Sequence, residues 1–140
     1  MQTKPLVIER TYNAPVNKVW DAITNVNKMR EWYFDLKDFK PEIGFTFEFI
    51  GECEGVKYLH LCEVTEVESG TKITYSWKYR DYLGSSYVTW ELFPEGDSTK
   101  LVLTHKGLDT FPPHKDFTRE SFTGGWTHFL GTALKNFLEN

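Results

Sequence analysis

The sequence predicts an α+β fold in which a curved antiparallel sheet of about six to seven strands wraps around one long C-terminal helix, with two short helices after the first strand. Three observations predict it. Residues 117–138 carry apolar side chains at helical spacing. Several segments between residues 45 and 105 alternate apolar and polar residues, as half-buried strands do. Short turn signals separate those segments, which indicates antiparallel pairing without crossover helices.

The C-terminal stretch, residues 117–138, is predicted to be an amphipathic helix with an aromatic face. At about 100° of rotation per residue, one narrow arc carries Phe122, Trp126, Phe129, Leu130, Ala133 and Phe137. Asp116 or Thr118 is placed to cap its first turn. No other predicted element is long enough to cover one face of a sheet, so the sheet is expected to lie against this helix.

The first 34 residues predict a strand followed by a pair of short helices. Residues 6–12 alternate in part and are typical of a strand, and Pro15 suits the first turn of the helix that follows. Inward positions at helical spacing are Val16, Val19, Trp20 and Ile23, and then Val26, Met29 and Trp32 in a second helix capped by Asn25. The aromatic run 32–34 either plugs the gap between helices and sheet or forms one side of a pocket mouth.

Four further segments present a clear apolar face. The faces consist of Phe45, Phe47 and Phe49; Ile73, Tyr75, Trp77 and Tyr79; Val88, Trp90 and Leu92; and Leu101, Leu103 and His105. For residues 56–67 the alternation leaves the inward face open. One parity carries Tyr58, His60, Cys62 and Val64, and the other carries Lys57, Leu59, Leu61 and Glu63.

Size and composition narrow the class of protein. A chain of 140 residues suits a single domain spanning residues 1–140. The net charge of −4 argues against a nucleic-acid partner. No run of about 18 apolar residues is present, so we expect no membrane span and a cytoplasmic location. Cys53 and Cys62 are expected to be reduced, since a domain of this size needs no disulfide.

The sequence carries no catalytic signature. Its four histidines lack metal-ligand spacing, and neither a serine elbow nor a phosphate-binding glycine loop is present. No metal or cofactor is expected. His105 lies on an inward parity, where a hydrogen-bonded structural role is favoured over that of a general base. Glu48, Glu63 and Asp81 are expected on the surface.

The aromatic content, 16% with five Trp and eleven Phe, favours a lined cavity over a solid core, which stays the alternative. Tyrosine and tryptophan bring polar atoms that a solid core would have to pair. The candidate ligand-binding residues are Trp32, Phe47, Phe49, Tyr75, Trp77, Tyr79, Trp90, His105, Phe122, Trp126 and Phe129.

A set of short motifs carries a family resemblance over nearly the whole chain. They are Arg10, Ala14-Pro15, residues 19–24, Trp32, Gly44, residues 75–77, Val88, Trp90, Leu92, Pro94, Thr99, Leu101, residues 103–105, Gly107, Gly125-Trp126, Leu130 and Leu134. In order and spacing they resemble the helix-grip, START-like (SRPBCC) superfamily, in the branch related to the C-terminal domain of the activator of heat-shock-protein-90 ATPase. The resemblance implies a cavity between sheet and helix, which in many relatives holds an apolar or aromatic small molecule.

Three functions are compatible with the sequence. The first is non-enzymatic binding of an apolar or aromatic small molecule between the sheet and the C-terminal helix. The second is an enzyme of cyclase or hydrolase type using His105 with a tyrosine. The third is a module that binds a chaperone or another protein. The resemblance leaves chaperone binding possible but unsupported: the activator has a separate N-terminal domain for gripping the chaperone, and we expect 140 residues to leave no room for one.

Two adjacent glycines in the C-terminal helix predict a moving part. Gly124 and Gly131 fall on the face away from the aromatic arc, where a glycine costs helix stability without allowing a close approach to the sheet. We therefore expect the helix to bend at Gly124-Gly125. Phe122 and Trp126, on either side of the pair, would then separate to admit a ligand.

Overall fold

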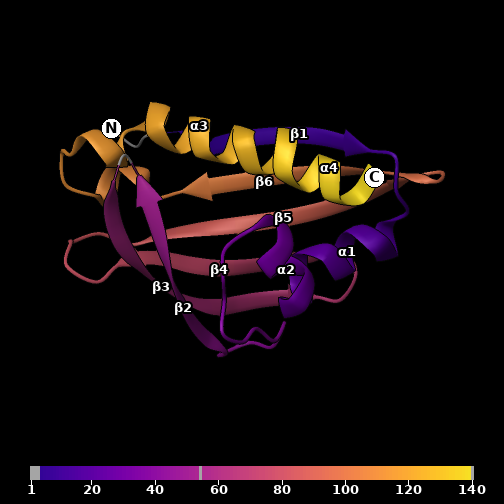
Figure 1. Ribbon diagram of the computed structural model, residues 1–140, viewed down its shortest axis with the longest axis horizontal. Coiled ribbons are helices and arrows are strands. Elements are labelled where there is room, and N and C mark those ends of the chain that lie inside the picture. The colour runs from indigo at the N-terminus through magenta and orange to yellow at the C-terminus, as the bar shows by residue number, and fades with distance from the viewer. Residues whose placement is uncertain (1–3, 54, 140) are drawn as a thin grey trace.

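The computed structural model describes residues 4–53 and 55–139 and has the predicted α+β architecture (Figure 1). A six-stranded antiparallel sheet has the order β1-β6-β5-β4-β3-β2. The strands are β1 (Leu6–Tyr12), β2 (Thr46–Cys53), β3 (Val56–Glu68), β4 (Lys72–Tyr79), β5 (Ser86–Glu95) and β6 (Ser98–Lys106). The helical segments are α1 (Val16–Thr24), α2 (Val26–Trp32), the 3-10 turns η1 (Leu108–Thr110) and η2 (Lys115–Phe117), α3 (Arg119–His128), the π turn η3 (Phe129–Ala133) and α4 (Leu134–Glu139).

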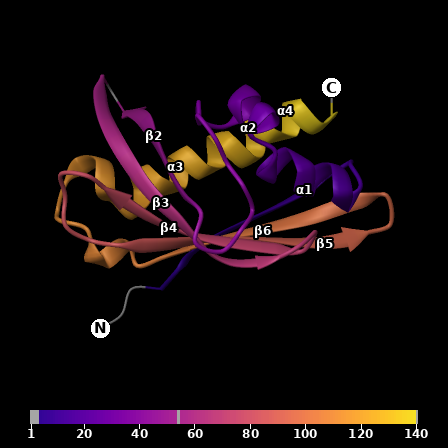
Figure 2. The ribbon, with the colours of Figure 1, turned by 90° about the horizontal axis from the view of Figure 1, so that it is seen from below.

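All the long helical segments lie on one face of the sheet (Figure 2). Strands β2 to β6 follow one another as hairpins, and β1 pairs with β6 at the far edge. β2 and β3 curl away from the flatter strands and rise beside α3 (Figure 2). This curvature leaves α3 facing both the middle of the sheet and the β2–β3 hairpin.

The inward face of β3 is the one that carries Tyr58 and His60. Tyr58, His60, Cys62 and Val64 are all buried, whereas their neighbours on the other parity are exposed or half-buried. The polar groups of two aromatic side chains, the Tyr58 phenol and the His60 imidazole, therefore lie on the face of the sheet that the helix covers. Periodicity alone could not decide this, because both parities contain apolar residues.

The C-terminal helix differs from the predicted one in its start. It begins at Arg119, and Thr118 is the cap: its hydroxyl accepts a hydrogen bond from the Ser121 backbone N–H at 3.1 Å. Phe117 belongs to the preceding turn η2. Asn25 caps α2 as predicted, accepting from the backbone N–H of Asn27 at 3.0 Å.

A π turn in the middle of the 21-residue C-terminal helix changes its buried face. The buried positions are Phe122, Trp126, Leu130, Leu134 and Leu138, while the predicted arc members Phe129, Ala133 and Phe137 are half-buried. A regular α-helix would rotate the last two leucines away from the sheet. At the π turn the Leu134 N–H bonds to the carbonyl of Phe129, five residues back. This wider turn slows the rotation and returns Leu134 and Leu138 to the core.

Tyr12 of β1 holds the π turn against the sheet. Its hydroxyl donates a 2.7 Å hydrogen bond to the Leu130 carbonyl. That carbonyl would accept from the Leu134 N–H in a regular α-helix, but the π turn directs this N–H to Phe129. Burial raises the pKa of the Tyr12 phenol well above its usual range, so the hydroxyl keeps the proton that it donates.

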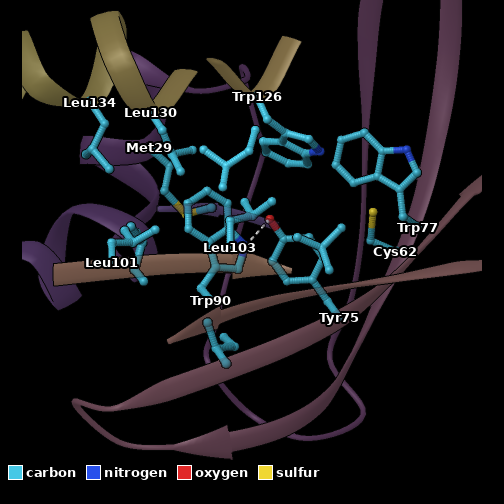
Figure 3. Packing of buried hydrophobic residues seen from close by; sticks show 14 of the residues in the cluster. Met29, Cys62, Tyr75, Trp77, Trp90, Leu101, Leu103, Trp126, Leu130 and Leu134 are labelled. Carbon is cyan, nitrogen blue, oxygen red and sulfur yellow. Dashed lines mark hydrogen bonds between the residues drawn. The ribbon is translucent and has the colours of Figure 1, made fainter. Parts of the chain in front are cut away.

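The core is aromatic, and its polar atoms are paired (Figure 3). The indole N–H of Trp32 donates to the Ala22 carbonyl at 2.8 Å. The indole N–H of Trp90 donates to the Tyr75 hydroxyl at 3.1 Å, and the Tyr33 hydroxyl lies 2.9 Å from the same oxygen. Within the described residues, no buried side-chain nitrogen or oxygen lacks a partner.

Cys62 is a free, buried thiol whose pKa is raised by burial. The side chain of Cys53, the other cysteine expected to be reduced, lies outside the described residues. No helix among the described residues is long and apolar enough to cross a membrane. Nor do three or more histidine, cysteine, aspartate or glutamate side chains among the described residues come together in a way that could hold a metal ion.

Candidate ligand-binding site

A cavity of about 280 Å³ lies where β2, β3 and β4 face the C-terminal helix. It is lined by Phe34, Gly51, Glu52, Tyr58, His60, Trp77, Tyr79, Asp116, Phe117, Ser121, Phe122, Gly125, Trp126, His128 and Phe129. Its volume lies just below the usual range for small-molecule pockets, about 300 to 1,000 Å³. The site is thus large enough for one small ligand.

The walls follow from strand and helix periodicity. On β4, Trp77 and Tyr79 turn to the buried face while Lys78 between them is exposed. On α3, Phe122 and Trp126 stand four residues apart on the buried face. The rings of Trp77 and Trp126 lie side by side, with centroids 5.3 Å apart (Figure 3). Gly125 contributes open space, because a Cβ there would meet nothing within 4 Å.

The structure divides the eleven candidate residues into two groups. Trp77, Tyr79, Phe122, Trp126 and Phe129 line the cavity. Trp32, Phe47, Phe49, Tyr75, Trp90 and His105 are buried beside it and contact other side chains instead. All share the inward face. Whether a residue lines the cavity depends on its position along its strand or helix. The alternation of apolar and polar residues does not predict that position.

Residues 32–34 account for the division. Trp32 and Tyr33 fill the part of the interior next to α2: the Tyr33 ring centroid lies 5.9 Å from that of Trp90 and 6.2 Å from that of Trp126. Phe34 reaches the cavity. The aromatic run therefore combines both interpretations, with two residues as a plug and the third as part of the cavity wall.

His60 is a site residue that the sequence left undecided. Its Nδ1 lies 3.0 Å from the Tyr58 carbonyl oxygen. A carbonyl can only accept, so Nδ1 carries the proton and Nε2 is the acceptor nitrogen. Burial lowers the pKa of His60 to about 4, against the smaller opposing effect of nearby backbone carbonyls. At neutral pH the ring is uncharged.

Gly51, which pairs with Tyr58 on β3 and lies diagonally across from His60, must be small. A Cβ at Gly51 would lie 2.7 Å from the His60 Cε1 and 3.2 Å from the Phe34 Cε1. Gly51 thus lets the imidazole ring and Phe34 lie directly over the β2 backbone. Periodicity carried no signal for this position, because the close approach involves a side chain of the neighbouring strand and Phe34, which precedes the sheet segment.

A phenol–carboxylate pair closes the end of the cavity formed by η2. The Tyr58 hydroxyl donates to the Asp116 carboxylate, joining β3 to η2 across 58 residues. Asp116 is buried, and the His114 imidazole lies 3.9 Å from the same carboxylate oxygen. On β4, the Tyr79 hydroxyl accepts from the Trp77 indole N–H at 2.9 Å. The sequence presented Asp116 only as a helix cap, a role that Thr118 fills.

His105 lies behind the cavity wall in a chain of hydrogen bonds. The Trp126 indole N–H, which can only donate, points to its Nδ1 at 3.1 Å. The proton therefore lies on Nε2, which donates to the Ser86 hydroxyl at 2.8 Å, and that hydroxyl donates to the Trp77 carbonyl at 2.9 Å. Burial lowers the pKa of His105 to about 3. Both ring nitrogens are engaged inside the protein, which is a structural arrangement.

The sequence of the chain and its fold agree with one known family. The model of the family described as Activator of Hsp90 ATPase homolog 1-like protein matches residues 13–139. The chain belongs to this family. Comparison with curated proteins finds no match.

Solved structures share this fold over nearly the whole chain. Protein MLL2253 from Mesorhizobium loti is 28% identical with a TM-score of 0.76, and the match covers 97% of each chain. CalU16 from Micromonospora echinospora is also 28% identical, with a TM-score of 0.76 over 96% of this chain and 76% of that one. DynU16, a protein of the dynemicin biosynthetic locus, is 21% identical with a TM-score of 0.80. The match covers 99% of this chain but only about half, 48%, of DynU16.

Proposed function

We propose that this member of the Activator of Hsp90 ATPase homolog 1-like family binds an apolar or aromatic small molecule in the cavity between the β2–β4 strands and α3. The observation that supports the proposal is the cavity itself. It has aromatic side chains from four directions: Phe34, the β4 pair Trp77 and Tyr79, the turn residue Phe117, and the helix residues Phe122, Trp126 and Phe129. Such a lining with a few polar groups is typical of ligand sites.

A binding role also agrees with the chemistry at the site. His105, the candidate general base, does not line the cavity, and both its nitrogens are hydrogen-bonded elsewhere. The histidine that does line it, His60, is neutral and a weak base because burial lowers its pKa to about 4. These groups suit recognition of a ligand better than proton transfer at neutral pH.

The adjacent glycines of α3 provide a matched test. A Cβ at either position meets nothing within 4 Å, but only Gly125 lines the cavity. Gly125→Leu should place a side chain in the space a ligand would take, whereas Gly124→Leu should leave that space open. Both substitutions exchange a helical glycine for a good helix former, so their effects on helix propensity are equal.

Binding is measured by the fluorescence of the neutral probe N-phenylnaphthylamine. The wild-type protein and Gly124→Leu should enhance its emission with the same Kd, and Gly125→Leu should weaken binding about tenfold or more, as expected for overfilling a site. Thermal unfolding verifies that both variants fold. The proposal fails if the wild-type protein gives no saturable enhancement, or if the two leucine variants bind equally well.

A further inference from the structure

His105, which the proposed function leaves without a role, lies directly behind the cavity wall. Its ring centroid is 5.1 Å from that of Phe122, 5.6 Å from that of Trp77 and 5.9 Å from that of Trp126. All three of these residues line the cavity, whereas His105 does not. The imidazole is fully buried. Any effect that it has on a ligand therefore passes through the side chains in front of it.

The hydrogen bond between Trp126 and His105 decides which part of the indole faces a ligand. The indole N–H can only donate, and it donates to the His105 Nδ1 at 3.1 Å. Because His105 lies behind the wall, the one polar atom of the Trp126 side chain is directed away from the cavity. The surface that Trp126 contributes to the cavity is therefore carbon.

Two further hydrogen bonds fix the imidazole in the orientation that accepts from Trp126. The Trp77 carbonyl can only accept, so the Ser86 hydroxyl donates to it at 2.9 Å. The Ser86 oxygen then accepts from the His105 Nε2–H at 2.8 Å. The proton cannot move to Nδ1 without breaking the bonds to Ser86 and Trp126. Burial also lowers the pKa of His105 to about 3, which keeps Nδ1 an acceptor at neutral pH.

From these observations we infer that His105 is a positioning residue that sets the ligand specificity of the cavity. By accepting the Trp126 N–H, it favours ligands that bring no hydrogen-bond acceptor to the Trp126 wall. A ligand carbonyl placed against that wall would give up its hydrogen bonds to water without gaining one, and a hydrocarbon gives up none. This inference rests on the proposed function, because it concerns the specificity of the same cavity.

Two substitutions at His105 separate the acceptor from the rest of the ring. His105→Phe keeps a flat side chain and removes both nitrogens, so the Trp126 N–H loses its partner. His105→Asn keeps an acceptor, because its amide oxygen is attached at the same branch point as Nδ1. Both variants lose the bond from Nε2 to Ser86, so that loss is matched. Both also retain the Tyr79 and Ser121 hydroxyls that line the cavity.

The selectivity is measured with two neutral probes of similar shape. Isopropylbenzene has no acceptor, and acetophenone carries a carbonyl. Their Kd values at pH 7 are obtained from displacement of N-phenylnaphthylamine, and the ratio of the two is compared between proteins, so that the different solubilities of the probes cancel. Relative to isopropylbenzene, acetophenone should gain about three- to tenfold in His105→Phe, where it can accept from the freed N–H. The ratio in His105→Asn should stay near that of the wild-type protein.

Nuclear magnetic resonance of the indole N–H groups adds a readout that a purely structural role would not move. The chain has five tryptophans, and Trp126→Phe identifies the signal of Trp126. In His105→Phe this proton should exchange with solvent about tenfold faster or more than in the wild-type protein. Acetophenone should shift the signal in that variant, and isopropylbenzene should not. His105→Asn should retain the slow exchange.

The wild-type protein provides a test that needs no variant, should His105→Phe fail to fold. Nitrogen chemical shifts of the His105 ring should show Nε2 protonated and Nδ1 unprotonated. The opposite tautomer would overturn the inference, because Nδ1 could not then accept from Trp126.

Each remaining outcome bears on a different statement. If the Kd ratio is the same in the wild-type protein and His105→Phe, the inference is overturned while the proposed binding function stands. If the ratio changes equally in His105→Phe and His105→Asn, the acceptor is not what matters and the positioning role is refuted. If N-phenylnaphthylamine and both probes fail to bind the wild-type protein, the proposed function is overturned and the inference with it.

Discussion

At the scale of single residues, two buried histidines in similar surroundings have different roles. Both have a pKa lowered by burial, to about 4 for His60 and about 3 for His105. His105 is surrounded by donor and acceptor side chains that use both its nitrogens. His60 lines the cavity and has one nitrogen held by a backbone carbonyl. Hydrogen-bond partners, not burial, distinguish a structural imidazole from a candidate recognition group.

The Ser86 hydroxyl is the link through which His105 is connected to β4. Ser86→Ala should destabilise the protein by about 1 to 3 kcal/mol, because the His105 Nε2–H loses its acceptor in a fully buried place. Urea unfolding measures the loss. Ser85→Ala, one residue earlier and half-buried, is the control and should cost much less. Equal effects of the two substitutions would contradict the hydrogen-bond chain.

At the scale of elements, the C-terminal helix carries two irregularities. The glycine pair lies in α3 beside the cavity, while the departure from α geometry lies one turn later, at Phe129–Ala133. That turn contains Gly131, whose Cβ would approach the Arg10 Nε at 3.5 Å. The π turn keeps the buried face of the helix toward the sheet both before and after the turn. The glycine pair leaves open space beside the cavity.

The predicted gate at Gly124 and Gly125 is tested by alanine at both positions. Neither methyl group meets a neighbour, so the double variant should be stabilised by about 1 kcal/mol per substitution. If Phe122 and Trp126 separate there to admit a ligand, stopped-flow association of N-phenylnaphthylamine should also become slower. Gly131→Ala, outside the cavity lining, is the comparison. Unchanged association rates in the double variant would leave the glycines without a gating role.

At the scale of the whole molecule, the aromatic interior makes the fold sensitive to acid. The unfolded chain takes up protons at His60 and His105 near the ordinary pKa of about 6.5. The folded protein does so only near the lowered values of about 4 and about 3. Because both pKa values are lowered on folding, this stability is complete above about pH 6.5 and is lost as the pH falls toward the folded values.

Equilibrium unfolding in urea between pH 7 and pH 5 should show this loss, about 4 kcal/mol by pH 5 if both histidines contribute fully. Near pH 5 the slope should correspond to nearly two protons taken up on unfolding. A slope well below one proton would contradict the burial of two neutral imidazoles.

Much of the fold could be predicted, because periodicity acts locally. Alternation in residues 73–79 identified the inward face of β4, and the spacing of Phe122 and Trp126 identified the buried face of α3. Cap chemistry identified Asn25 as the start of α2 and offered Thr118 as one of two caps for α3. The order of these elements, with the motifs, was enough to indicate the family that the comparison confirms.

The site could be predicted only in part. Strand and helix periodicity identified Trp77 and Trp126, which line the cavity, and equally Phe47 and Trp90, which do not. The difference arises because Tyr33 fills the space in front of Trp90. His60 depended on the inward face of β3, which its own alternation left undecided.

The sequence by itself determined the elements, their order, most of their buried faces and the aromatic composition of the interior, since each follows from residues close together in the chain. The tertiary structure alone decided where the interior is solid and where it is open. It also decided that Tyr58 meets Asp116, that Gly51 meets His60 and that a π turn realigns the last helix. The Tyr58–Asp116 contact joins residues far apart in the chain. The geometry of all three features depends on sheet curvature and packing, which no local pattern records.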